Sequence, residues 1–484
     1  MNKELRGVSI VVLLMFIALF SSSTIIQVFQ QDNLKADGRN ARTLYASFSA
    51  ERGPILVDGE PIAVSVPVDD EYKYQRQYAN GPLYSAVTGY FTLNQGNTGI
   101  EGSLNDYLSG TANEQFLDQL NAIITGQNPK GAAVELTIDP VVQQAAWDAL
   151  GDQKGAVVAI DPKTGGILAM VSKPTFDPTL LATHDGTAFR QAYDALIDDP
   201  DDPLINRAIA GDLNPPGSTF KLVVTAAALE SGLSPDTEFP NPPTLTLPQS
   251  TAVITNAEGG TCGGGANASI ATALRLSCNI PFAQLGLQLG YSTVSKQARL
   301  FGFEDDDLRV PMRVEPSVYP PTESDAEQML SSFGQASDRV TPLQMAMVSA
   351  AIANGGQLMK PTLVESILAP DLTVLQGFEP EVYSTPVSAA TASTMTGMMV
   401  NGVANGAASN ARINGIDVAG KTGTAENGDG EPYTLWFTGF APANDPRVAI
   451  AVVVENGGGL GQSGFGNRVA APIARSVMEA VLSR

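Results

Sequence analysis

Histidine is nearly absent from this chain: His184 is the one histidine among 484 residues. A Ser-His-Asp triad needs a histidine beside the nucleophile, and zinc sites are built mostly from histidine and cysteine. His184 stands in a stretch of loop-like composition and belongs to no motif, so we expect a solvated loop residue. The sequence therefore predicts no histidine triad, no metal site and no cofactor.

Basic residues are also scarce. Lys and Arg number 28 against 50 Asp and Glu, which gives a formal net charge of −22. Neutralising phosphates requires clustered Lys and Arg, so this balance argues against nucleic acid as a partner. The simplest interpretation of the acidity is that it keeps the protein soluble.

Cysteine occurs only twice, as Cys262 and Cys278. Outside the cytoplasm such a pair can oxidise, and closing a loop of this length stabilises by roughly 3 kcal/mol in the chain-entropy model. The alternative is two unpaired small apolar side chains. Their spacing leaves both alternatives open.

One long apolar run stands near the start, and residues 8–29 carry no charge. The run is long enough to cross a bilayer as a helix. Lys3 and Arg6 precede it, so the positive-inside rule places residues 1–7 in the cytoplasm and the chain after the run outside the membrane. The rival interpretation is a cleaved signal peptide, but no Ala-x-Ala site follows and residues 25–29 prolong the run. We predict a single-pass anchor in the cell membrane.

The rest of the chain divides into two parts. Residues 30–130 mix short apolar runs with Gly, Asn and Asp and contain no chemical constellation, so we expect a smaller, strand-containing module. In residues 131–484, apolar runs flank turn residues at 155–172 and again at 435–455, which predicts two hairpins. With one more strand at Lys421 they predict a five-stranded antiparallel sheet covered by helices, an α+β fold.

Helices and loops are also predicted in the larger part. Residues 173–205 have the composition of a loop-rich excursion. Thr341-Pro342 has the pattern of a helix start and Gly355-Gly356 that of a stop, so we expect a helix between them. Further helical patterns lie at residues 220–231 and 469–482.

The chemistry begins at Ser218. Pro-Pro-Gly leads into this serine, and Lys221 follows at the start of an apolar helical pattern. Residues three apart on a helix are neighbours, so the lysine returns beside the serine. A serine hydroxyl needs a base, and burial or a nearby cation lowers the pKa of a lysine enough for it to act as one. The pair predicts a nucleophile and its base, although S-x-x-K alone is common by chance.

The second motif is Ser277-Cys278-Asn279. Its hydroxyl can relay a proton, and its amide can hold a substrate carbonyl. Serine and asparagine also make turns and caps, so the motif carries weight only through its position after Ser218 and beside an apolar helix.

The third motif is Lys421-Thr422-Gly423-Thr424, which follows a strand-like run. Its cation and hydroxyls can bind a carboxylate. Gly423 would let an extended peptide approach the strand edge closely and add to it as a further strand.

The third motif has a competing interpretation. Residues 415–422 also match G-x-x-x-x-G-K-T, the phosphate loop of nucleotide-binding proteins. That loop needs a glycine-rich interior and a helix after it. Here the interior is strand-like, and the residues that follow are rich in Gly and Pro. We therefore favour the peptide-binding interpretation.

Together these motifs resemble those of the class B penicillin-binding proteins, in particular the actinobacterial PbpA type. The resemblance extends to the N-terminal anchor, to residues 52–55, and to residues 334–335 followed by 341–346. Class A members carry a glycosyltransferase domain, for which residues 30–154 offer no second catalytic constellation. The resemblance implies that residues 131–484 are a transpeptidase domain and residues 30–130 a dimerisation or pedestal-like module.

The resemblance also implies a mechanism. Ser218 would attack the penultimate D-Ala carbonyl of a peptidoglycan stem peptide, with Lys221 as the base. Ser277 would pass the proton to the leaving amine. The backbone N–H groups of Ser218 and Thr424 would form the oxyanion hole, and each such donor is worth roughly 10²–10³ in rate. β-Lactam antibiotics mimic the donor and would acylate Ser218.

Substrate contacts follow from the same resemblance. Asn279 would hold the donor peptide, and Lys421, Thr422 and Thr424 would bind its terminal carboxylate beside Gly423. The implied setting is the extracytoplasmic face of the membrane, in cell-wall synthesis during growth and division. By analogy with relatives, the expected partner is a RodA-type membrane glycosyltransferase.

Two other functions fit the same motifs. A β-lactamase or D,D-carboxypeptidase would use water as the acceptor; Glu315, Glu323 and Glu327 lie between the second and third motifs, but without the E-x-x-L-N pattern of a deacylating glutamate. A non-catalytic β-lactam sensor or cell-wall scaffold would have no need of Ser218 and Lys221 together.

Overall fold

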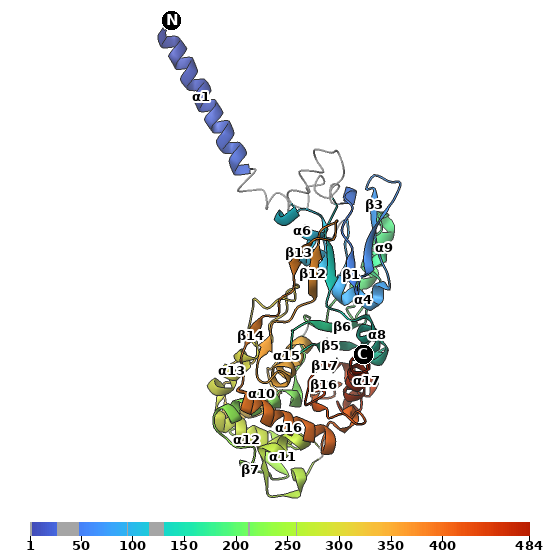
Figure 1. The fold of residues 1–484 in the computed structure, drawn as a ribbon. Coiled ribbons are helices and arrows are strands. Elements are labelled where there is room, and N and C mark those ends of the chain that lie inside the picture. Colours follow the sequence, from blue (N-terminus) through green and yellow to red (C-terminus); the bar gives the residue numbers. More distant parts are fainter. Residues whose placement is uncertain (1, 27–47, 94, 116–129, 212, 258) are drawn as a thin grey trace.

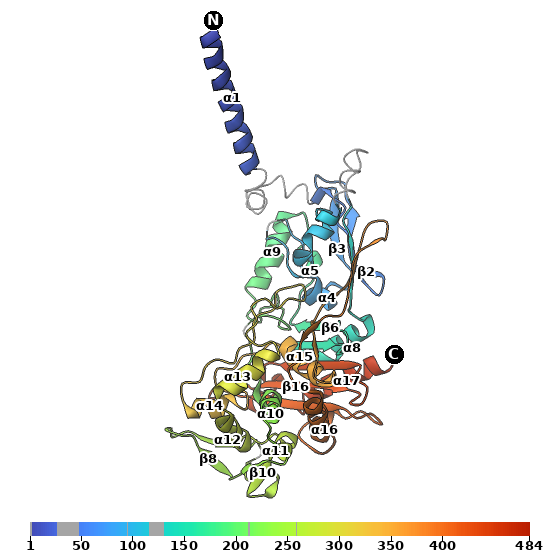
Figure 2. The same cartoon turned by 60° about the vertical axis from the view of Figure 1, so that its left-hand side comes forward.

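The computed structural model describes the chain apart from residues 1, 27–47, 94, 116–129, 212 and 258. Figure 1 shows an elongated body with one long helix, α1, standing clear of it. A mixed sheet lies at one end of the body, an antiparallel sheet in the middle and a group of helices at the other end. Figure 2 shows the same order from another side.

Helix α1 (Asn2–Thr24) covers most of the predicted membrane anchor. Its segment Leu5–Thr24 is long and apolar enough to cross a bilayer, and it is not buried against any other described residue. The anchor was predicted over residues 8–29, of which 27–29 lie outside the described residues. So do residues 30–47 and 116–129 of the predicted N-terminal module.

The mixed sheet at one end combines three distant parts of the chain. Its strand order is β13-β12-β4-β1-β2-β3, in which β1 and β4 run parallel and the other neighbours antiparallel. Val134 on β4 lies opposite Ile55 on β1 and Ile367 on β12, and all three side chains are buried, so their apolar positions fix the register. The strands are β1 (Ile55–Val57), β2 (Glu60–Pro67), β3 (Tyr74–Tyr78), β4 (Ala133–Leu136), β12 (Val364–Leu368) and β13 (Val374–Gly377).

A buried ion cluster ties this sheet to the short helices beside it, α4 (Gly81–Thr88), α5 (Gly99–Ser103) and α6 (Asn105–Leu108). The Glu101 carboxylate lies 2.5 Å from Arg52 Nε and 2.6 Å from Arg76 Nε, and all three side chains are almost fully buried. Arg52 also donates to the Glu101 carbonyl, and its guanidinium lies over the Phe91 ring. Burial opposes ionisation of Glu101, but the two arginines outweigh it and lower the pKa of Glu101.

The antiparallel sheet in the middle confirms the predicted five strands, in the order β15-β16-β17-β5-β6. Every residue of β5, β16 and β17 is buried, as expected for continuous apolar strands with both faces covered. Its strands are β5 (Gly155–Ile160), β6 (Ile167–Lys173), β15 (Ala419–Ala425), β16 (Thr434–Ala441) and β17 (Val448–Val454).

Helices cover both faces of this sheet. Helices α8 (Pro140–Leu150) and α17 (Ala470–Leu482) pack on one face, where Val452 belongs to their apolar cluster. Helix α15 (Pro342–Ala353) packs on the other face, in the cluster that contains the next residue, Val453. The Thr341 side chain accepts a hydrogen bond from Gln344 N and caps α15. The predicted helix between Thr341 and Gly355 is therefore confirmed.

Further helices gather at the far end of the body (Figures 1 and 2). They are α10 (Lys221–Glu230), α11 (Ile270–Leu276), α12 (Ile280–Leu289), α13 (Tyr291–Leu300), α14 (Asp325–Ser331) and α16 (Ala389–Asn405). Three two-stranded antiparallel sheets complete the larger module, formed by β7 (Glu238–Pro240) with β10 (Asn267–Ser269), β8 (Thr244–Thr246) with β9 (Val253–Thr255), and β11 (Leu358–Met359) with β14 (Val382–Ser384).

The excursion at residues 173–205 is less loop-like than predicted. It contains helix α9 (Gly186–Ile197), whose Phe189 packs with Tyr90 of the N-terminal module and with Phe176. The expectation for His184 was wrong: its side chain is only 10% exposed, and Nδ1 lies 2.6 Å from Asp70 Oδ2. Contacts between these two modules, which composition does not reveal, explain both differences.

Asp338 is the most unusual buried acid in the larger module. Its side chain is fully buried, and neither carboxylate oxygen has a hydrogen-bond partner within the described part of the chain. Loss of hydration therefore raises the pKa of Asp338 well above its usual value of 3.8.

This burial predicts a pH-dependent stability. The folded-state pKa is raised, so the contribution of Asp338 to stability is complete below about pH 4 and is lost as pH rises toward the folded pKa, by at most about 1.4 kcal/mol per pH unit. Asp338→Asn should therefore show little advantage over the wild type at pH 4 and a growing one toward pH 7. Urea unfolding at pH 4 and pH 7 measures the difference in free energy of unfolding between the variant and the wild type. The exposed Asp198→Asn is the control, and an equal effect of both variants would contradict the prediction.

Candidate active site

Ser218 lies on a tight turn that precedes helix α10. Residues 217–219 form one turn of 3₁₀ helix, and α10 begins at Lys221. Gly217 has φ +51°, a left-handed conformation that glycine adopts without strain, and its N–H donates to Gly334 O at 2.9 Å. A Cβ atom on Gly334 would lie 1.9 Å from Gly217 O. The two glycines therefore permit the close contact that shapes the turn.

The antiparallel sheet holds this turn from the other side. Trp436 Nε1 on β16 donates to Pro215 O at 2.9 Å. On β15, a Cβ atom at Gly423 would lie 2.8 Å from Pro216 O, so this position must stay free of a side chain for the turn to dock. The sequence interpretation assigned Gly423 to substrate approach, and the structure adds this packing requirement. Ser218 is thus fixed against the edge strand β15.

Lys221 is fully buried beside the nucleophile. Its Nζ lies 3.0 Å from Ser218 Oγ, 2.8 Å from Ser277 O and 2.8 Å from Asn279 Oδ1. Burial, followed by the positive charge of Lys421, holds the pKa of Lys221 well below its usual value of 10.5. A neutral amine has two hydrogens and one lone pair. The carbonyls of Ser277 and Asn279 accept the two hydrogens, so the lone pair is left for the Ser218 hydroxyl.

Ser277 joins the other two motifs. It ends helix α11 in a left-handed conformation with φ +63°, and its Oγ accepts a hydrogen bond from Lys421 Nζ at 2.7 Å. Burial lowers the pKa of Lys421 to about 7. The structure therefore brings Ser218, Lys221 and Ser277 together with Asn279 and Lys421, which the sequence places far apart.

The threonines of the third motif point elsewhere. Thr422 Oγ1 donates to Ala407 O at 3.2 Å, and Thr424 Oγ1 accepts from Gly466 N at 3.2 Å. Thr424 is half-buried and keeps its own hydroxyl hydrogen for a ligand, whereas the Thr422 hydroxyl hydrogen is already used. Of the two, Thr424 is the better placed to contact a substrate carboxylate.

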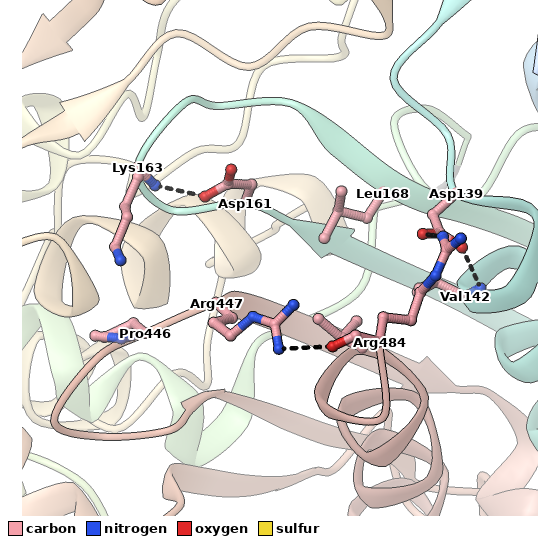
Figure 3. A pocket seen from close by; sticks show the side chains of 9 residues that line it. Asp139, Val142, Asp161, Lys163, Leu168, Pro446, Arg447 and Arg484 are labelled. Carbon is pink, nitrogen blue, oxygen red and sulfur yellow. Dashed lines mark hydrogen bonds and ion pairs between the residues drawn. The ribbon is translucent and has the colours of Figure 1, made fainter. Parts of the chain in front are cut away.

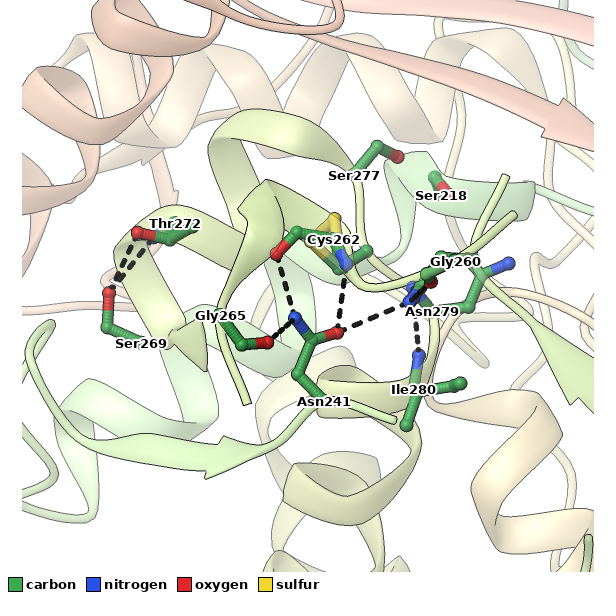
Figure 4. Close-up of a disulfide and its surroundings, with 12 residues drawn as sticks. Ser218, Asn241, Gly260, Cys262, Gly265, Ser269, Thr272, Ser277, Asn279 and Ile280 are labelled. Atoms are coloured by element: carbon green, nitrogen blue, oxygen red, sulfur yellow. Dashed lines mark hydrogen bonds between the residues drawn. A yellow bond between two sulfur atoms is a disulfide. The ribbon is translucent and has the colours of Figure 1, made fainter. Parts of the chain in front are cut away.

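The two cysteines form a disulfide in the structure, with a Cα–Cα distance of 5.8 Å. Figure 4 shows it beside Ser277, Asn279 and Ser218. It ties the loop that carries Cys262 to the second motif at Cys278. The same loop region contains Asn241 and Asn256, two buried asparagines that sequence reasoning missed because they belong to no motif.

The phosphate-loop interpretation does not fit this geometry. Lys421 and Thr422 lie inside strand β15, which continues to Ala425, so no helix follows them to receive a phosphate. The G-x-x-x-x-G-K-T match is therefore a coincidence of sequence.

A hollow of about 460 Å³ lies near the C-terminus (Figure 3) and is unconnected with these motifs. Charges of both signs line it. Arg484 pairs with Asp139, Lys163 pairs with Asp445, which is not among the lining residues, and Arg447 donates to the Arg484 carbonyl. None of the described residues that line it belongs to a motif.

Two protein-family profiles match the chain. Residues 155–479 match the penicillin-binding protein transpeptidase domain, and residues 52–134 match the penicillin-binding protein A dimerisation domain. The peptidoglycan D,D-transpeptidase PbpA of Mycolicibacterium smegmatis is 42% identical over 100% of this chain and 99% of its own length. PbpA of Mycobacterium tuberculosis is 40% identical over the same shares.

Solved structures agree with these relatives. The ceftriaxone acyl-enzyme complex of penicillin-binding protein A from M. tuberculosis covers 90% of this chain and 100% of its own, with 39% identity and a TM-score of 0.87. The penicillin G acyl-enzyme of the same protein gives a TM-score of 0.85 at 39% identity, over the same shares of both chains.

Proposed function

This chain belongs to the penicillin-binding transpeptidases of the PbpA type, and we propose that it cross-links peptidoglycan stem peptides through an acyl ester on Ser218. The observation that carries the assignment to Ser218 is the fully buried Lys221, whose Nζ lies 3.0 Å from Ser218 Oγ. Burial and a second cation favour the neutral amine, which is the form that accepts a proton.

The positions of Ser218, Lys221 and Ser277 support the following acylation step. Ser218 Oγ attacks the penultimate D-Ala carbonyl while its proton passes to Lys221. The negative oxygen is stabilised by the N–H groups of Ser218 and Thr424, whose segments are in contact: a Cβ atom on Gly217 would lie 3.0 Å from Thr424 O. The proton reaches the leaving amine through Ser277, the C–N bond breaks and D-Ala departs. An amine of a second stem peptide repeats the sequence in reverse and forms the cross-link.

Substrate binding uses the remaining motif residues. Lys421 and the hydroxyl of Thr424 bind the terminal carboxylate of the donor, with Thr422 holding β15 in place. A bound carboxylate raises the pKa of Lys421 from about 7 and so keeps it charged. Asn279 binds the donor amide, and the donor backbone extends along the edge of β15 beside Gly423.

The setting follows from the anchor and the relatives. Helix α1 would hold the protein in the membrane, and Lys3 and Arg6 before it favour, by the positive-inside rule, a body on the extracytoplasmic side. We assign residues 30–130 to a dimerisation or pedestal-like module and residues 131–484 to the transpeptidase. The stem peptides belong to a lipid-linked precursor polymer, for which a RodA-type glycosyltransferase is the proposed partner.

The lifetime of the penicillin adduct tests the proposal. We expect the detergent-solubilised full-length protein to gain the mass of one penicillin G, to carry it on the peptide that contains Ser218, and to keep it for many minutes. Rapid hydrolysis would indicate a β-lactamase instead. D-Ala release from a D-Ala-D-Ala peptide without transfer to an added amine would indicate a carboxypeptidase. Absence of any adduct would remove the acyl-enzyme assignment.

A further inference from the structure

Helix α12 starts at the second motif, and its first N–H groups need acceptors. A helix start leaves several N–H groups without partners in the helix, and the side chain at the N-cap position normally accepts from them. That position belongs to Asn279. Among the described residues, the Asn279 side chain makes no capping bond, because its Oδ1 accepts from Lys221 Nζ at 2.8 Å and its Nδ2 donates to Thr255 O at 3.0 Å.

Asn256, in another segment of the chain, accepts from the first two N–H groups at this helix start. Its Oδ1 accepts from Asn279 N at 2.9 Å and from Ile280 N at 3.2 Å. Its Nδ2 donates to Gly260 O at 3.1 Å and to Asn241 Oδ1 at 3.3 Å. Asn256 is only 4% exposed. The orientation of this amide follows from its partners, since backbone N–H groups can only donate and a backbone carbonyl can only accept.

Asn241 anchors Asn256 in turn. It is fully buried, donates through Nδ2 to Cys262 O at 2.8 Å and Gly265 O at 3.1 Å, and accepts from Cys262 N at 3.2 Å. Figure 4 shows Asn241 between the Cys262 and Gly265 backbones, close to the disulfide. The loop, Asn241 and Asn256 therefore form one hydrogen-bonded support beneath the second motif.

We propose that Asn256 is a positioning residue for the base: by accepting from the N–H groups of Asn279 and Ile280 it fixes the backbone from which the Asn279 side chain orients Lys221. Without Asn256, these two N–H groups lose their acceptor and the backbone at Asn279 is free to shift. A shift that moves the Asn279 carbonyl away from Lys221 Nζ removes one of the two carbonyl acceptors of Lys221, and its lone pair is then no longer directed at Ser218. This inference rests on the proposed acylation of Ser218 and adds a residue outside the three motifs.

The test is a double-mutant cycle on the full-length protein, with fluorescent penicillin as the probe. Asn256→Ala is expected to lower the second-order acylation rate constant by on the order of 10- to 100-fold, the scale of a small misplacement of a reacting group. In the Asn279→Ala background the same change is expected to cost little, because the residue acts through Asn279. Asn256→Asp keeps an acceptor for both N–H groups, and its protonated carboxyl can donate to Gly260 O as the amide does, so near pH 5 it should acylate faster than Asn256→Ala.

Asp139→Ala provides the matched control. The Asp139 side chain also accepts from two N–H groups at a helix start, those of Val141 and Val142 in α8, but it lies outside all three motifs. Its loss should lower the melting temperature and leave acylation unchanged.

Three results would overturn the inference. They are an Asn256→Ala protein that acylates at the wild-type rate, an equal loss in both backgrounds of the cycle, or, if Asn256→Ala does not fold, an Asn256→Asp protein as slow as Asn279→Ala near pH 5. A wild-type protein that forms no adduct would instead refute the proposed function itself.

Discussion

Replacing Ser218 with alanine is expected to abolish the covalent penicillin adduct while the protein stays folded. The proposed adduct is an ester of Ser218 Oγ, and among the described residues Ser218 is the one whose hydroxyl forms a hydrogen bond with Lys221 Nζ, at 3.0 Å. Loss of Ser218 Oγ should not disturb the fold of the site, because Lys221 Nζ keeps its hydrogen bonds to Ser277 O and Asn279 Oδ1. In-gel fluorescence after labelling measures the adduct, and a melting curve of the same sample shows whether the protein is folded.

Ser231→Ala is the matched control for this variant. Ser231 is an exposed serine at the other end of α10, so its hydroxyl is lost from the same helix without any change at the motifs. Labelling should persist in this control. Residual labelling of Ser218→Ala at the wild-type rate would place the nucleophile elsewhere.

The second large effect concerns stability, and Glu101 produces it. Glu101→Ala removes the one carboxylate that lies between Arg52 and Arg76, and leaves two buried guanidinium groups without a counter-charge. Breaking a buried ion pair in this way costs about 3–5 kcal/mol. The free energy of unfolding should fall by that amount in urea titrations followed by circular dichroism. Glu101→Gln keeps the shape of the side chain and some of its hydrogen bonds. Its free energy of unfolding should lie between those of the wild type and Glu101→Ala.

An exposed ion pair of the same module gives the comparison. Glu51 lies 2.9 Å from Lys130, with side chains 36% and 59% exposed, so Glu51→Ala should cost less than about 1 kcal/mol. Because Glu101 lies outside all three motifs, the folded fraction of Glu101→Ala should still label with penicillin. A small stability loss, similar to that of Glu51→Ala, would show that the buried cluster is not what stabilises the module.

Much of the larger module could be predicted from short-range patterns. Four of the five strands of the antiparallel sheet are largely apolar runs beside turn residues, and α15 has a start signal at Thr341 and a stop at Gly355. The spacing of Ser218 and Lys221 is also local, since one turn of helix brings them together. The meeting of all three motifs, by contrast, was predicted from family resemblance, because no local rule joins Ser277 to Lys421.

The features that escaped prediction depend on tertiary contacts. Asn256 resembles any turn residue until the start of α12 is known to lie against it. Asp338 resembles any surface acid until its burial is seen. Helix α9 is marginal by itself, and its Phe189 gains a partner only when the N-terminal module is present. In each case the deciding neighbour lies far away in the sequence.

The mixed sheet has a consequence for how the chain can be divided. Strands β12 and β13 come from the middle of the larger module; β12 pairs with β4 and β13 with β12, and they complete a sheet that begins with β1 to β3. A protein cut after residue 134 would therefore not give two folding units. The N-terminal piece would lose the partner of β1, and the C-terminal piece would keep the β12–β13 hairpin without the sheet it belongs to. Backbone hydrogen bonds also join the two sheets, from Ile167 N to Thr362 O and from Thr362 N to Gly165 O, so a rotation of the mixed sheet against the antiparallel sheet would have to break them. The backbone itself therefore sets how far Ser218 lies from the mixed sheet.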